Sequence, residues 1–137
     1  MEYALSNDSI SIKVSTAGGS FTSIEADGRE YLWQGDPAVW SGQAPICFPI
    51  CGGLRDGNAM TFAGHHVKLA RHGFARKQEW KLLSQSANEL AMCLASEDNA
   101  ALLSDYPYPF KLVARYTLEG DAVRVSYEVT NEGTEDM

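Results

Sequence analysis

The feature that most constrains the fold is a regular alternation of apolar and polar residues near the end of the sequence. Every second residue in two neighbouring runs is apolar: Leu112, Ala114, Tyr116 and Leu118, then Val123, Val125, Tyr127 and Val129. Glu119-Gly120-Asp121 lies between the runs and has the composition of a turn. A period of two is typical of a strand with one buried face, so the two runs predict an antiparallel hairpin.

The same period recurs earlier in the chain. Residues 9–14 alternate, with Ile10, Ile12 and Val14 on one face, and 21–25 form a second extended run that ends at the turn residues Ala26-Asp27-Gly28. Residues 78–96 contain two extended runs around Ala87-Asn88 and predict a further hairpin.

Only residues 99–104 favour a helix, with Asp98 or Asn99 as its cap and Pro107 and Pro109 limiting its length. No repeat, low-complexity tract or charged linker indicates a second domain. The predicted fold class is therefore all-β, an antiparallel β-sandwich formed by residues 1–137 as a single domain.

Charge and hydropathy exclude two classes of partner. The 137 residues include 11 Lys and Arg against 18 Asp and Glu, a net charge of -7, and the basic residues form no run. This balance opposes binding to a phosphate backbone, so we expect no nucleic-acid partner. No apolar run reaches the roughly 18 residues that a membrane span needs, and residues 1–5 do not begin a secretory leader. We expect a cytoplasmic protein without a membrane partner.

The cysteines predict neither a disulfide framework nor a metal site. Cys47, Cys51 and Cys93 are odd in number and have apolar neighbours, which is typical of small buried thiols. Their apolar surroundings are expected to raise the thiol pKa, which opposes a role as nucleophile. The spacing of Cys47 and Cys51 from the three histidines matches no zinc pattern, so no metal is expected.

The candidate site is His72-Gly73-Phe74-Ala75-Arg76, which places a proton-transfer group near a fixed cation. The charges of Arg71 and Arg76 favour a neutral imidazole that donates one hydrogen bond and accepts another, while their guanidinium groups bind hydroxyl or phosphate oxygens. Arg55 is the only cation in the glycine-rich segment 43–57, which reads equally as a buried strand with a tight exit or as a ligand-binding loop.

A tryptophan just after this motif, or a pair of tyrosines further along the chain, offers a flat apolar wall to a sugar ring, although packing in the core explains each of them equally well. They are Trp80, Tyr106 and Tyr108.

Four segments together resemble the aldose 1-epimerase (galactose mutarotase) family. They are Phe48-Pro49-Ile50-Cys51-Gly52, His72-Gly73-Phe74-Ala75-Arg76, Tyr106-Pro107-Tyr108-Pro109-Phe110 and Tyr116-Thr117-Leu118. The His-Gly-Phe-Ala-Arg motif is most similar to the branch that includes hexose-6-phosphate mutarotase relatives.

The resemblance implies a galactose mutarotase-like supersandwich that holds a hexose or hexose phosphate and interconverts its α and β anomers without a cofactor. A carboxylate takes the proton of the anomeric hydroxyl and a histidine protonates the ring oxygen. It implies a catalytic, substrate-contacting role for His72 and contact of Arg76 with an anionic substituent. Arg55 and Arg71 are further substrate-binding candidates.

The chain also departs from the family pattern. Gly52-Gly53 is followed by Arg55 where relatives often have Gly-Arg, and Arg71 stands where many have glutamine. The second histidine and the base glutamate that the resemblance implies would lie beyond residue 137. We therefore expect the chain to match the N-terminal portion of a longer sandwich and to be inactive alone. Exposed strand edges in such a piece need a second copy in a homo-oligomer, the missing half or another covering element.

Two alternatives to an isomerase stay open. One is a non-catalytic carbohydrate-binding β-sandwich that uses the histidine and the arginines for recognition. The other is a structural or assembly module whose segment 43–57 covers an edge strand.

Overall fold

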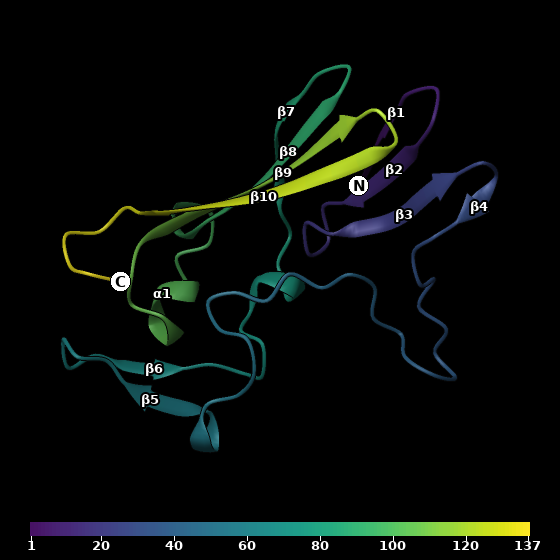
Figure 1. The fold of residues 1–137 in the computed structure, drawn as a ribbon. Coiled ribbons are helices and arrows are strands. Elements are labelled where there is room, and N and C mark those ends of the chain that lie inside the picture. Colours follow the sequence, from purple (N-terminus) through teal and green to yellow (C-terminus); the bar gives the residue numbers. More distant parts are fainter.

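The computed structural model describes residues 1–137, which form two four-stranded sheets and one two-stranded sheet, all antiparallel (Figure 1). The first sheet has the order β1-β2-β3-β4, with β1 Glu2–Ser6, β2 Ser11–Ser15, β3 Phe21–Ala26 and β4 Arg29–Glu30. The second has the order β10-β9-β8-β7, with β7 Lys81–Gln85, β8 Glu89–Ala95, β9 Phe110–Glu119 and β10 Ala122–Asn131. The third pairs β5 Asn58–Met60 with β6 His66–Lys68.

The predicted strands and hairpins are confirmed where the period of two was regular. β9 pairs with β10 so that Tyr116 lies opposite Val125, and the connecting Gly120 has a φ of 63°. At the β3–β4 turn, Asp27 and Gly28 both have positive φ, 51° and 71°. This backbone matches the right-handed twist of a tight hairpin, and a short polar residue followed by glycine adopts it readily.

The two large sheets pack against each other as a β-sandwich, which confirms the predicted fold class. Their facing side chains belong to one cluster of 17 buried residues, and burial of each large aliphatic member contributes about 1.5–3 kcal/mol. The members on the paired strands are Leu5, Ile12, Val14, Leu90, Met92, Leu94, Phe110, Leu112, Ala114, Tyr116 and Leu118.

One part of the predicted burial is wrong. The alternation placed the apolar residues of β10 in the core, but Tyr127 and Val129 are 56% and 44% exposed. Together with Leu112 and the segment from Pro45 to Phe48, they line an apolar hollow of about 310 Å³. Periodicity identifies which residues share a face, but what packs on that face depends on segments distant in sequence.

The expected helix is present but short. α1 covers Leu102–Asp105, and neither Asp98 nor Asn99 caps it through a side chain, because Ala101 occupies the N-cap position. The Asn99 side chain instead donates to Oε1 of Gln78 at 3.1 Å. Three 3-10 turns complete the helical content: Arg55–Gly57, Ala75–Lys77 and Ser96–Asp98. None of these helices has the length and apolar composition needed to cross a bilayer.

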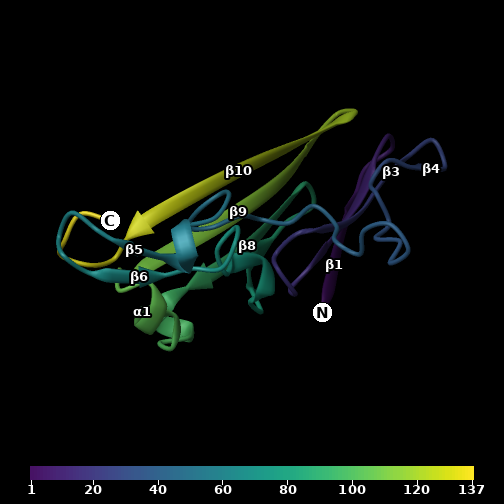
Figure 2. The ribbon, with the colours of Figure 1, turned by 90° about the horizontal axis from the view of Figure 1, so that it is seen from below.

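The small sheet lies apart from the sandwich core, on the side of α1. Figure 2 shows the β5–β6 hairpin beside the C-terminal end of the described chain. A contact of 2.5 Å between His65 Nε2 and Glu135 Oε2 joins the hairpin to this end.

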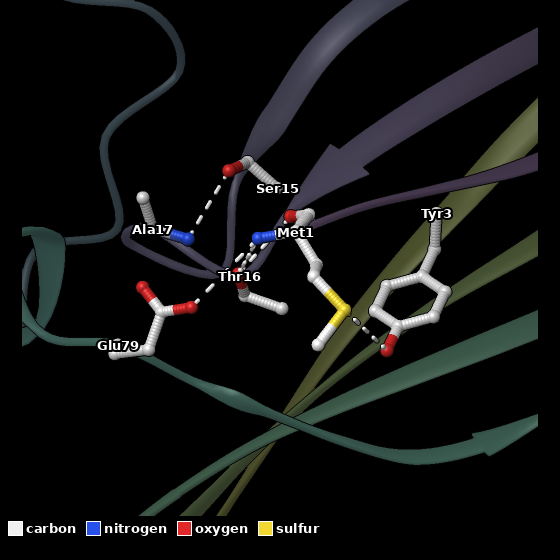
Figure 3. A network of polar contacts seen from close by, with 6 residues as sticks. All are labelled: Met1, Tyr3, Ser15, Thr16, Ala17 and Glu79. Carbon is white, nitrogen blue, oxygen red and sulfur yellow. Dashed lines mark hydrogen bonds and ion pairs between the residues drawn. The ribbon is translucent and has the colours of Figure 1, made fainter.

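A polar network joins the first sheet to the segment that enters β7 (Figure 3). The Met1 amine donates to Thr16 Oγ1 at 2.6 Å and lies 3.9 Å from a carboxylate oxygen of Glu79. The Thr16 carbonyl accepts a hydrogen bond of 2.7 Å from the Trp80 amide. These contacts hold the segment that follows the His72 motif against Thr16, directly after the end of β2.

Replacing Tyr116 by phenylalanine tests the packing between the sheets. The Tyr116 hydroxyl is buried and donates to the Gly19 carbonyl, and burial raises its pKa far above the ordinary value. We expect Tyr116→Phe to lower the free energy of unfolding by about 1–2 kcal/mol, measured by urea denaturation. Tyr127→Phe, at a side chain that is 56% exposed, is the control and should leave it nearly unchanged. Equal effects of the two substitutions would contradict this packing.

Candidate functional site

A long segment without regular strands connects β4 to the Arg55–Gly57 turn and crosses one end of the sandwich (Figure 1). It is fixed by Ile46 and Phe48, which are 6% and 9% exposed. The Phe48 ring packs against Phe74, with ring centroids 5.9 Å apart, and against Phe110, with centroids 4.9 Å apart. The two candidate motifs therefore meet through their aromatic side chains.

Backbone hydrogen bonds join the two motifs more tightly. The Phe48 carbonyl accepts from the amides of Phe74 and Ala75, at 2.9 and 3.3 Å. The His72 amide donates to the Gly52 carbonyl at 2.6 Å. Gly73 has a φ of 71°, and a Cβ at this position would lie 2.0 Å from the Phe48 carbonyl oxygen. Only glycine accommodates both this positive φ and the close contact with the Phe48 carbonyl oxygen.

His72 is held by a hydrogen bond to its ring. The Gly52 amide donates to Nδ1 of His72 at 3.0 Å, and the residue is half-buried with a φ of 69°. A nitrogen that accepts a hydrogen bond carries no hydrogen, so the neutral ring carries its hydrogen on Nε2. The arrangement therefore gives an imidazole that donates one hydrogen bond from Nε2, for example to a substrate oxygen.

Arg76 lies near His72 in sequence, but it lines a hollow that His72 does not reach. Its Nη2 donates to the Arg71 carbonyl at 3.0 Å, and its Nε is buried without a hydrogen-bond partner. The hollow has a volume of about 350 Å³ and is lined by Ser15, Ala17, Ser20, Phe21, Thr22, Trp40, Gly42, Gln43, Pro45 and Arg76. Hydroxyl, amide, indole and guanidinium groups suit a polyhydroxylated or anionic ligand. His72 is not among the lining residues.

The other two candidate arginines do not line the hollow around Arg76. Arg55 is exposed within the Arg55–Gly57 turn, and Arg71 is exposed beside the motif. Neither side chain forms a hydrogen bond or an ion pair in the structure, and neither lines the hollow around Arg76. Their roles as substrate ligands stay predictions.

Two cysteines converge on the histidine. Cys47 Sγ, Cys51 Sγ and a ring nitrogen of His72 all lie within 4.8 Å of one another. Cys47 and Cys51 are exposed, so the expectation that they are buried thiols is wrong for this pair, and only Cys93 is buried. The expected direction of the Cys47 pKa is confirmed. Although the residue is exposed, partial burial of its sulfur raises the pKa of Cys47, the neighbouring Cys51 thiol raises it further, and the charge of Arg76 partly opposes this.

Of the two expected aromatic walls, the one formed by Trp80 is wrong, whereas the one formed by Tyr106 and Tyr108 stays a prediction. Trp80 is 1% exposed and donates from Nε1 to the Ala75 carbonyl at 3.0 Å, so it supports the motif from the core and cannot face a ligand. Tyr108 is 5% exposed and Tyr106 is half-buried, and both line a hollow of about 850 Å³ near the C-terminal end of the described chain. Trp40, which the sequence did not single out, is 51% exposed and lines the hollow beside Arg76.

The sequence and the fold are similar to known proteins over nearly the whole chain. Two proteins of Lactococcus lactis subsp. lactis, the plasmid and chromosomal forms of Protein LacX, are 43% identical over 143 residues, covering 98% of this chain and 46% of each relative. The chain thus spans about half the length of the curated relatives it matches.

Solved structures share the fold. A galactose mutarotase-like protein from Lactobacillus casei superposes with a TM-score of 0.92 at 25% identity, over 100% of this chain and 46% of that one. A galactose mutarotase related enzyme from Lactobacillus acidophilus superposes with a TM-score of 0.88 at 28% identity, over 96% and 43%. The family model described as aldose 1-epimerase matches residues 1–137. The chain belongs to the aldose 1-epimerase family.

Proposed function

We propose that this chain contributes the histidine side of a sugar site in an isomerase that interconverts the α and β anomers of a hexose or hexose phosphate. The observation that carries the proposal is the hydrogen bond from the Gly52 amide to His72 Nδ1, which leaves Nε2–H free to donate. Family membership supports a sugar as the ligand.

In the proposed reaction, a carboxylate takes the proton of the anomeric hydroxyl and the bond between the anomeric carbon and the ring oxygen breaks. The ring oxygen gains a proton while the anomeric carbon becomes an aldehyde, and rotation before closure gives the other anomer. His72 Nε2–H would donate to the ring oxygen and stabilise the charge that develops there. The base carboxylate, which the resemblance places beyond residue 137, has to come from the rest of a longer protein.

Anomer exchange measured by NMR or polarimetry tests this function. We expect a form as long as the relatives to accelerate the conversion of α-glucose or α-galactose, and residues 1–137 alone to bind the sugar without accelerating it. Binding by the longer form without any acceleration would favour a carbohydrate-binding protein instead. If the longer form neither binds the sugar nor accelerates the exchange, the result would contradict a sugar site and favour an assembly module.

One observation favours the alternative of a non-catalytic carbohydrate-binding protein. The hollow beside Arg76 combines an exposed indole with amide and hydroxyl groups and excludes His72, so it can hold a sugar without the catalytic group. Saturation-transfer NMR on variants separates the two sites: Trp40→Ala should abolish binding only if this hollow is the sugar site.

Arg76 is expected to set the preference for a phosphorylated sugar. Its guanidinium lines the hollow, and its buried Nε has no partner within the protein. We expect Arg76→Gln to weaken binding of a hexose 6-phosphate by about ten- to hundredfold, with a smaller effect on the unphosphorylated hexose, because a charged hydrogen bond contributes about 1.5–3 kcal/mol. Calorimetric titration provides the measurement. Arg124→Gln, at an exposed arginine on β10 that does not line the hollow, is the matched control. An equal loss for both sugars would contradict the assignment.

A further inference from the structure

The pair of thiols beside His72 is not used by the proposed reaction. Cys47 and Cys51 are the two exposed cysteines, they are separated by three residues, and their sulfur atoms lie within 4.8 Å of each other. A disulfide has an S–S distance of about 2.05 Å, so the two sulfurs must approach further for a bond to form.

The surrounding backbone indicates which cysteine moves. Cys47 lies between the buried side chains of Ile46 and Phe48, and the Phe48 carbonyl is held by two amides. Cys51 precedes Gly52 and Gly53, and an added Cβ at either glycine would meet no atom within 4 Å. The Cys51 side of the pair therefore has room to shift toward Cys47, and the contacts that this shift acts on are the two hydrogen bonds between Gly52 and His72.

A metal ion fits this cluster less well than a covalent bond between the thiols. Two thiolates and an imidazole are a donor set that zinc accepts. However, the ring nitrogen that a metal needs is compromised, because Nδ1 accepts from the Gly52 amide and the neutral ring then keeps its hydrogen on Nε2. A metal would have to take the Nδ1 lone pair away from the Gly52 amide, whereas a disulfide needs no nitrogen ligand and leaves Nδ1 able to accept a hydrogen bond.

We propose that Cys47 and Cys51 form a reversible intramolecular disulfide that disturbs the hydrogen bond from the Gly52 amide to His72. Cys51 adjoins Gly52, so a shift of Cys51 toward Cys47 moves the amide that fixes the imidazole. The site is thus an oxidisable dithiol attached directly to the candidate catalytic histidine. Its effect on sugar turnover rests on the proposed function, but the formation of the disulfide does not.

The oxidant is a small disulfide such as oxidised glutathione. The thiolate of the exposed Cys51 attacks a sulfur of that disulfide, forms a mixed disulfide and releases one glutathione thiolate. The second cysteine then attacks the protein sulfur of the mixed disulfide, which forms the Cys47–Cys51 bond and releases the second glutathione thiolate. Two protein thiols are oxidised, one glutathione disulfide is reduced to two thiols, and excess reduced glutathione reverses the exchange.

Mass spectrometry after thiol exchange tests this proposal. The protein is equilibrated with graded ratios of oxidised to reduced glutathione, quenched with acid, alkylated and digested. We expect a peptide in which Cys47 and Cys51 are linked and Cys93 is alkylated, and we expect the loss of this peptide in Cys47→Ser and in Cys51→Ser. Cys93→Ser, at the buried cysteine on β8, is the matched control and should retain the link. Stable glutathione adducts on both exposed cysteines, or a link to Cys93, would overturn the proposal.

Nitrogen NMR of the His72 ring tests the coupling without any sugar. In the reduced protein the ring should show Nδ1 as the acceptor, and this signal should shift when the disulfide forms. The Cys47→Ser variant should keep the reduced spectrum under the same oxidant. A disulfide that forms with no change in the His72 ring would overturn the coupling to the histidine. A disulfide that forms and shifts the ring signal in a protein that shows no turnover, even when reduced, would count against the proposed function alone.

Discussion

Gly73→Ala is expected to destabilise the protein by about 3 kcal/mol or more, because two separate penalties fall on this residue. The first is a φ of 71°, which costs an L-residue about 1–2 kcal/mol. The second is the approach of the new Cβ to 2.0 Å from the Phe48 carbonyl oxygen. That oxygen accepts from Phe74 and Ala75, so relieving the clash separates the two motifs. Urea denaturation gives the change in the free energy of unfolding.

Gly28 provides a matched control for this substitution. It also has a φ of 71°, but a Cβ at Gly28 would meet no atom within 4 Å. Gly28→Ala should therefore lower the free energy of unfolding by only about 1–2 kcal/mol. The difference between the two variants in lost free energy of unfolding measures the cost of the clash with the Phe48 carbonyl. Equal losses in both would show that the close approach of Gly73 to Phe48 is not a constraint in solution.

His72→Asn is expected to lower the rate of anomer exchange by about 10²–10⁴-fold in a form as long as the relatives, which is the usual contribution of a positioned acid or base. Asparagine tolerates the positive φ of 69° at this position better than most residues. Its side-chain oxygen can accept the hydrogen bond of the Gly52 amide in place of Nδ1. It has no donor where Nε2 lies, so the variant removes the chemistry while preserving the local fold.

His66→Asn is the control for this second substitution, because His66 is exposed on β6. We expect both variants to keep the free energy of unfolding within about 1 kcal/mol of the parent, and only His72→Asn to lose activity. Exchange rates that survive in His72→Asn would remove His72 from the reaction, even if the sugar still binds.

The elements of the fold that could be predicted from the sequence are those set by local periodicity. The regular alternation at Ile12 and Val14 and along β9 reflects burial on one face of a strand. The apolar residues of both strands are buried as expected. The alternation in β10 has the same form, yet Tyr127 is exposed, because burial depends on what covers the strand. Capping of α1 was mispredicted for a similar reason, since Asn99 bonds Gln78, distant in sequence.

The site was harder to predict than the strands. His72 and Arg76 could be identified as candidates because they share one short motif. The motif does not indicate that Arg76 lines a hollow from which His72 is absent. The link from Gly52 to His72 joins residues 20 positions apart in segments that lack any periodicity. A signal for the thiol pair was present, because Cys51 lies within the Phe48–Gly52 motif and Cys47 directly precedes it. Their exposure had no such signal, since the neighbouring residues are apolar.

Nitrogen NMR of the His72 imidazole in labelled protein tests the central claim most directly, because it reports which ring nitrogen carries the hydrogen. We predict hydrogen on Nε2 and none on Nδ1, with a hydrogen-bond coupling between Nδ1 and the Gly52 amide. A hydrogen on Nδ1, or a Gly52 amide that exchanges freely with water and shows no coupling to the ring, would contradict the account.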